Sequence, residues 1–152
     1  MLAETLIVTT FVSGILIFLF IQFNNLSSAY NESYKYNTVE GLYSLRNIRD
    51  YVYNEPDIYY EIDDVVDFNE ILDITDCEKN RAFELEYCKL LFELEDIKTL
   101  IVATNSFNLE NFENRDEELK MFVGKIKPTG DEKYRLIAEF NDGTFATIRM
   151  GS

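Results

Sequence analysis

The chain has 152 residues, enough for one modest globular domain beside a separate N-terminal segment. It carries 28 acidic and 14 basic residues, and this net charge of −14 argues against direct binding to the phosphates of nucleic acids or to anionic lipid. The sequence contains no histidine, which excludes enzymes built on a Ser-His-Asp or Cys-His arrangement.

Other catalytic and cofactor signatures are missing as well. The six glycines are scattered, so no glycine-rich loop is available to cradle a phosphate. Acidic pairs such as Asp63 and Asp64 could hold a divalent cation, but no spacing matches an EF-hand loop. We therefore predict that the protein is not an enzyme and that it uses no metal and no cofactor.

The N-terminal segment, residues 1–23, is the most distinctive stretch of the chain. From Leu6 to Phe23 it has neither a charged residue nor a proline, and these 18 residues reach the lower limit for a helix that spans a bilayer. A secretory signal peptide would need a positive n-region and a shorter apolar run, and no basic residue precedes Lys35. A plain membrane anchor fits the length but leaves Glu4 unexplained. A third alternative is packing against identical helices, where Glu4 would meet the α-amino group of Met1 on the next copy.

Residues 24–56 continue the helical pattern with a change of character. Apolar residues recur mostly at steps of three and four, which predicts an amphipathic helix with one apolar stripe. They are Leu26, Tyr30, Tyr34, Val39, Leu42, Leu45, Ile48 and Val52. No proline appears before Pro56, so we predict one nearly continuous helix from about Ala3 to Tyr53.

Residues 57–152 form an acidic globular part, with 23 of the acidic and 11 of the basic residues. The pattern predicts a short strand at Ile58–Ile62 and a short helix or irregular connection from Val65 to Leu72. A helix is expected from Glu78 to Glu95, because one face would carry a set of apolar residues at helical spacing. That set is Phe83, Tyr87, Leu90, Leu91 and Leu94.

The rest of this part contains the clearest strand signals. Ile97–Thr104 reads as a central strand. A short helix is expected around Leu119–Ile126, capped near Asn114 or Asp116, and a turn at Pro128–Asp131. The runs 134–140 and 144–150 flank Asn141-Asp142-Gly143, which predicts a β-hairpin whose first strand buries one face. The fold class is therefore α+β, with about three antiparallel strands and two short helices packed on the second half of the long helix.

Cys77 and Cys88 allow one disulfide. In one continuous helix they would lie about 16 Å apart, so a bridge requires Cys77 to precede the helix and fold back. An extracellular location would permit this bond, whereas Cys88 beside the apolar helix face could equally be a buried, inert thiol.

Three short features near the N-terminus resemble a known family. They are the acid Glu4, the run Thr5-Leu6-Ile7-Val8 and the later Gly14-Ile15-Leu16. Together they look like the start of a mature type IV pilin or pseudopilin, and the resemblance covers roughly residues 1–55. Two departures stand out: the acid is the fourth residue rather than the fifth, and Gln22 lies near the place of the usual proline. Met1 is thus either an initiator or the residue after a removed leader.

The resemblance implies an assembly mechanism. In that family a prepilin peptidase removes the leader, the new N-terminal residue is methylated, and the acid pairs with the N-terminus of a neighbouring subunit. Met1 and Glu4 would be the assembly residues here. The residues expected to pack in the filament core are Leu6, Ile7, Phe11, Gly14, Ile15, Phe18 and Phe20.

The function that we predict is a structural subunit of an extracellular, type IV pilus-like helical filament. It would be a homo-oligomer that rests in the inner (cytoplasmic) membrane before the pilus assembly machinery extracts it, and it would serve adhesion or motility at the cell surface. Two alternatives remain: a single-span membrane protein whose acidic domain binds an extracellular partner, and a minor pseudopilin of a DNA-uptake or secretion machine.

Overall fold

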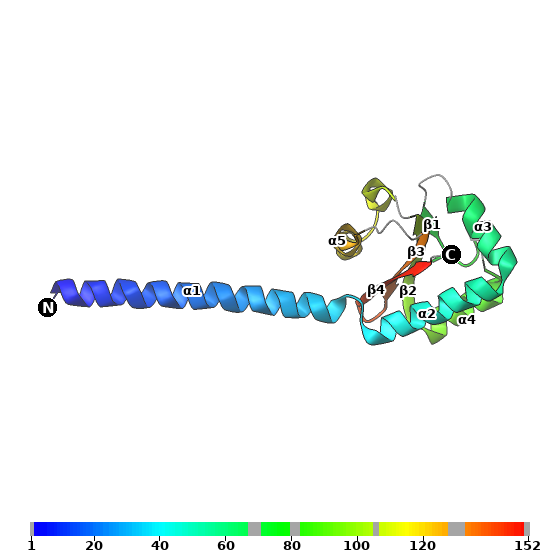
Figure 1. The fold of residues 1–152 in the computed structure, drawn as a ribbon. Helices are drawn as coiled ribbons and strands as arrows, with labels where there is room; N and C mark the ends of the chain where they lie inside the picture. Colours follow the sequence, from blue (N-terminus) through cyan, green and yellow to red (C-terminus); the bar gives the residue numbers. More distant parts are fainter. Residues whose placement is uncertain (1, 67–70, 80–82, 105–106, 128–132, 151–152) are drawn as a thin grey trace. The chain divides into compact units, whose positions relative to one another are not determined.

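The computed structural model describes residues 2–66, 71–79, 83–104, 107–127 and 133–150 (Figure 1). The chain divides into two compact units, Met1–Tyr34 and Lys35–Ser152. The first unit consists of helix α1 (Leu2–Lys35) without its last residue, and the second is a small α+β domain with a four-stranded antiparallel sheet. The predicted fold class is confirmed.

The prediction of one continuous helix is wrong at three residues. Helix α1 ends at Lys35 and helix α2 (Val39–Asn54) begins after Thr38. Asn37 between them has a φ of 54°, in the left-handed region, which no α-helix interior tolerates. The Thr38 hydroxyl accepts a hydrogen bond from the N–H of Gly41 at 3.1 Å and so caps the new helix. Helical periodicity survives across the break, so the sequence pattern did not reveal it.

The sheet has the strand order β1-β2-β3-β4. Strands β3 (Tyr134–Phe140) and β4 (Phe145–Met150) form the predicted hairpin, in which Gly143 takes a φ of 80°. Strand β2 (Ile97–Thr104) has the predicted bounds and pairs with β3. The fourth strand, β1 (Ile71–Asp73), pairs with β2 and was not predicted, because three half-buried residues carry no readable alternation.

Both faces of the sheet are covered, so every residue of β3 is buried rather than only one face of it. The main core lies under α2, helix α3 (Pro56–Val66) and helix α4 (Leu85–Leu94), and it includes Ile48, Leu100 and Leu136. The second core lies under the short 3-10 helix η1 (Leu109–Phe112) and helix α5 (Glu117–Lys125). It includes Ile137 and Phe145.

Several local predictions need correction. Ile58–Ile62 lies inside helix α3 and is not a strand, because Ile58, Tyr59 and Ile62 face the main core at helical spacing. Residues 67–70 of the expected connection, and the expected turn at Pro128–Asp131, lie outside the described residues. The expected helix around Leu119–Ile126 is confirmed as α5, with Asp116 at its N-cap position.

Helix α4 is shorter than predicted and faces the core differently. It begins at Leu85 instead of Glu78. Phe83 and Leu91 are buried as expected, but Leu90 and Leu94 of the predicted apolar face are exposed. The Cys77–Cys88 disulfide and the burial of Cys88 set the rotation of the helix, and this rotation turns Leu90 and Leu94 outward.

Candidate functional site

The predicted packing residues of helix α1 are all exposed, and all of them except Gly14 carry a large apolar side chain. Their exposed fractions run from 45% for Ile15 to 70% for Phe11. Exposed apolar residues occur on all sides of the helix from Leu6 to Phe23, and no residue of the most apolar stretch is buried within the structure. An apolar surface of this kind requires cover by lipid or by other protein.

The few polar side chains within this stretch can be buried against lipid or protein at little cost. The hydroxyl of Thr9 donates to the carbonyl oxygen of Thr5, Thr10 donates to Leu6 at 2.7 Å, and Ser13 donates to Thr9 at 2.8 Å. Each hydroxyl is thus satisfied by the helix backbone one turn earlier. The helix can therefore enter an apolar medium without unpaired hydroxyl groups at these positions.

Gly14 lies at the centre of one face of α1. A Cβ atom added there would meet nothing within 4 Å. A shallow apolar hollow surrounds it, and every predicted packing residue except Phe20 lines this hollow. The lining residues are Leu6, Ile7, Thr10, Phe11, Gly14, Ile15 and Phe18. A glycine inside such a face allows a second helix to approach closely.

Of the two predicted assembly residues, the structure describes only one. Met1 lies outside the described residues, whereas Glu4 lies in the first turn of α1. A carboxylate at this position interacts favourably with the positive end of its own helix dipole. The pairing of Glu4 with the N-terminus of another copy stays a prediction.

Helix α1 is long and apolar enough to cross a membrane, by length and composition. Its 34 residues would extend about 51 Å at 1.5 Å per residue, which exceeds the hydrocarbon thickness of about 30 Å. By composition alone, a signal sequence near an N-terminus would pass the same test.

Cys77 and Cys88 are joined by a disulfide, with Cα atoms 5.7 Å apart. Cys77 precedes helix α4 and Cys88 lies within it. This arrangement brings together two cysteines that a single continuous helix would have kept apart. A disulfide of this kind persists in oxidising compartments.

The α+β domain contains two ionic clusters, and the first joins α3 to the sheet. One carboxylate oxygen of Asp63 accepts hydrogen bonds from Lys133 Nζ and from the hydroxyl of buried Tyr134. The hydrogen bond from Lys133, followed by that from Tyr134, lowers the pKa of Asp63 below its usual value. Burial, and then the bond to Asp63, raises the pKa of Tyr134 to about 12.

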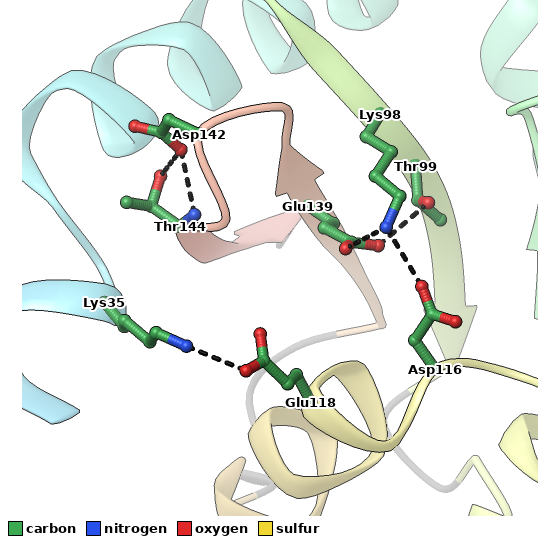
Figure 2. Close-up of polar contacts among 8 residues, drawn as sticks. All are labelled: Lys35, Lys98, Thr99, Asp116, Glu118, Glu139, Asp142 and Thr144. Atoms are coloured by element: carbon green, nitrogen blue, oxygen red, sulfur yellow. Dashed lines mark hydrogen bonds and ion pairs between the residues drawn. The ribbon is translucent and has the colours of Figure 1, made fainter.

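The second cluster attaches α5 to the sheet (Figure 2). Lys98 Nζ lies 2.7 Å from a carboxylate oxygen of buried Glu139 and 2.9 Å from Asp116, and Thr99 donates to Glu139 at 3.1 Å. The bond to Glu139, followed by that to Asp116, raises the pKa of Lys98. Lys98 therefore stays charged at neutral pH and holds the start of α5 beside β2 and β3.

These polar groups do not form a metal site. Within the described ranges, no group of three or more aspartate, glutamate or cysteine side chains is placed to hold a metal ion. Each cluster pairs its carboxylates with lysine or hydroxyl partners and ties a helix to the sheet. The candidate functional element is the exposed apolar surface of α1.

Comparison with known proteins does not add a relative to these observations. No protein-family model, no curated protein and no solved structure matches the chain.

Proposed function

We propose that the chain is the structural subunit of an extracellular type IV pilus-like helical filament, assembled through helix α1. The observation that carries the proposal is the face of α1 around Gly14. Six of the seven residues assigned to filament-core packing meet there, all exposed, on a helix whose Thr and Ser hydroxyls are internally bonded. A stack of identical helices would cover this face in every copy.

Two further features support the proposal. The first residues resemble those of mature type IV pilins, with Glu4 beside the apolar run. The disulfide between Cys77 and Cys88 fits a domain on the oxidising side of a membrane, which an extracellular filament requires. Before assembly, α1 would lie in the cytoplasmic membrane, and the acidic domain would then coat the filament and keep it soluble.

A single-span membrane protein with an extracellular binding domain is the second candidate, favoured by the length of α1 alone. A minor pseudopilin would share the same helix and differ in copy number. Negative-stain microscopy of material sheared from the producing cells, combined with mass spectrometry of the N-terminus, separates these functions. We expect long thin filaments with this chain as the main component and a processed or methylated first residue. A chain that stays in the membrane fraction with an unprocessed start, and no filaments, would overturn the proposal in favour of the anchored protein.

A further inference from the structure

Helix α4 exposes three leucines to solvent although it is only ten residues long. Leu85, Leu90 and Leu94 are 44%, 51% and 72% exposed. Leu90 and Leu94 are four residues apart, so they lie one turn apart on the same side of the helix. A different side of the helix is anchored in the main core by buried Cys88 and Leu91. The leucine pair is therefore held outward by the fold and is not a consequence of a loose helix.

A stack of tyrosine rings continues this apolar strip onto α2. The rings of Tyr51 on α2 and Tyr87 on α4 are stacked, with centroids 3.8 Å apart and planes 15° apart. Both tyrosines are half-buried, and Tyr87 lies about one turn before Leu90 and about two turns before Leu94, on the same side of α4. In Figure 1, α2 and α4 run beside each other, in agreement with this contact. We call the surface formed by Tyr51, Tyr87, Leu90 and Leu94 the α2–α4 face.

Carboxylates border the α2–α4 face. Glu86 and Glu93 are exposed on the same side of α4 as Leu90, at four residues before it and three after it. Burial is the main cause that raises the pKa of the Tyr51 and Tyr87 hydroxyls. The nearby charges of Glu55 and Glu84 raise the pKa of Tyr51 further, and the charge of Glu95 contributes to the raised pKa of Tyr87. The one lysine of α4, Lys89, lies 3.8 Å from Glu78, which offsets its charge.

Apolar and aromatic groups inside an acidic border fit a specific class of partner. Leucine side chains gain from burial against another apolar surface, and the edge of the tyrosine stack extends that surface. A border of carboxylates steers a cationic segment toward the face and repels an anionic one. A second copy of this acidic chain would offer the carboxylate border of this face no complementary charge, so the contacts proposed for α1 are not extended to this face.

We propose that the α2–α4 face is a docking site for a cationic amphipathic helix of another protein. The apolar side of that helix covers Leu90, Leu94 and the edge of the tyrosine stack, and its Lys and Arg side chains meet the surrounding carboxylates. This site lies entirely within the α+β domain and does not depend on the proposed role of α1.

A designed amphipathic helical peptide, with Leu on one face and Lys on the other and labelled with a fluorophore, tests the site. The full-length chain is held in nanodiscs of zwitterionic lipid, and anisotropy with empty nanodiscs is subtracted. We expect saturable binding that Leu90→Ser with Leu94→Ser weakens by about tenfold, because each substitution removes an apolar contact. Leu109→Ser is the matched control, since Leu109 is 54% exposed on η1, and it should change the affinity by less than about twofold.

A second pair of variants separates the charges from the apolar contacts. Glu86→Gln with Glu93→Gln should weaken binding several-fold, and more at low salt, whereas Glu113→Gln, also at an exposed position just after η1, should not. A benzophenone on the peptide should cross-link to residues of α2 and α4. Equal affinity of the Leu90/Leu94 and Leu109 variants, or cross-links spread over the whole acidic surface, would show only non-specific attraction and overturn the proposal. Far-UV circular dichroism confirms that each variant keeps the fold.

Discussion

The backbone N–H of Asn37 donates a hydrogen bond of 2.7 Å to the carbonyl oxygen of Phe145, the first residue of strand β4. The side-chain oxygen of Asn37 accepts from the N–H of Thr147 at 3.0 Å, so one residue satisfies two groups on the outer edge of the sheet. Beside it, the ring of Tyr36 packs on Phe122 and Phe145. The break between α1 and α2 is therefore held by tertiary contacts and not by a helix-breaking residue.

Substitution of Asn37 should separate backbone strain from the lost hydrogen bond. Asn37→Gly keeps the left-handed φ and loses only the bond from Thr147, so we expect the free energy of unfolding to fall by about 0.5–1 kcal/mol. Asn37→Val adds the strain of a β-branched residue at positive φ, and the loss should reach about 2 kcal/mol or more. Urea unfolding in detergent micelles, followed by near-UV circular dichroism of the tyrosines, measures both. Equal losses would contradict the role assigned to the left-handed conformation.

Gly41 and Gly124 offer a matched pair of helical glycines. A Cβ atom on Gly41 would lie 2.9 Å from Phe140 Cε2 and 3.0 Å from Ala146 Cβ, because α2 packs closely on the sheet there. Gly41→Ala should therefore lower the free energy of unfolding by about 1–3 kcal/mol. Gly124→Ala on α5 meets nothing within 4 Å and should raise it by up to about 1 kcal/mol. The same unfolding assay measures whether each substitution raises or lowers the free energy of unfolding. Stabilisation by Gly41→Ala would show that Phe140 and Ala146 can move to make room for the added methyl group.

The disulfide should contribute substantially to the stability of the domain. Cys77 and Cys88 are 11 residues apart. Closing a loop of this length lowers the conformational entropy of the unfolded chain, which stabilises the folded domain by about 3 kcal/mol. A reducing agent should therefore lower the Tm of the wild-type chain. The double variant Cys77→Ser with Cys88→Ala should already unfold at a lower temperature and show no response to the reducing agent. A wild-type Tm that is indifferent to reduction would contradict this assignment.

The Asp63 cluster predicts a pH dependence on the acid side. The pKa of Asp63 is lower in the folded chain, because Lys133 and Tyr134 donate hydrogen bonds to its charged form. Ionised Asp63 therefore contributes to the free energy of unfolding. This contribution is fully present above the pKa of Asp63 in the unfolded chain, about 3.9, and is lost as the pH falls through the lower pKa of the folded chain. The stability difference between wild type and Asp63→Asn should thus be constant from about pH 5 to 8 and shrink below about pH 4.

Urea titrations at a series of pH values measure that difference directly. Glu113→Gln serves as the control, since Glu113 is exposed and lies outside this cluster. Its difference from wild type should stay small and flat across the same range. If the difference in free energy of unfolding between wild type and Asp63→Asn did not shrink at acid pH, the hydrogen bonds to ionised Asp63 would not stabilise the fold.

Glu4 should be required for assembly but not for membrane insertion. In a stack of α1 helices a carboxylate without a partner would cost several kcal/mol, so the proposed pairing with a neighbouring N-terminus fixes the register. Glu4→Gln should reach the membrane fraction at wild-type levels and yield no sheared filaments. Glu32→Gln, in the polar end of the same helix, is the matched control and should assemble. Normal filaments from Glu4→Gln would contradict the pairing hypothesis. The filament proposal itself is tested separately, by the negative-stain microscopy of sheared material.

The sequence by itself determined the elements whose signals are local. The uncharged, proline-free run from Leu6 to Phe23 predicted an apolar helix, and α1 contains the whole of it. Asp142-Gly143 between two alternating runs determined the hairpin of β3 and β4, and the β-branched run predicted the bounds of β2.

Tertiary structure decided the rest, because contacts between distant residues outweigh local preference there. Asn37 leaves the helix only because Phe145 and Thr147 on β4 bind it, more than a hundred residues away. Strand β1 exists because β2 offers an edge to pair with, and Leu90 and Leu94 face solvent because the disulfide and the main core set the rotation of α4. Helical periodicity indicated which residues lie on the apolar side of a helix, whereas packing decided which of them are buried and which stay exposed.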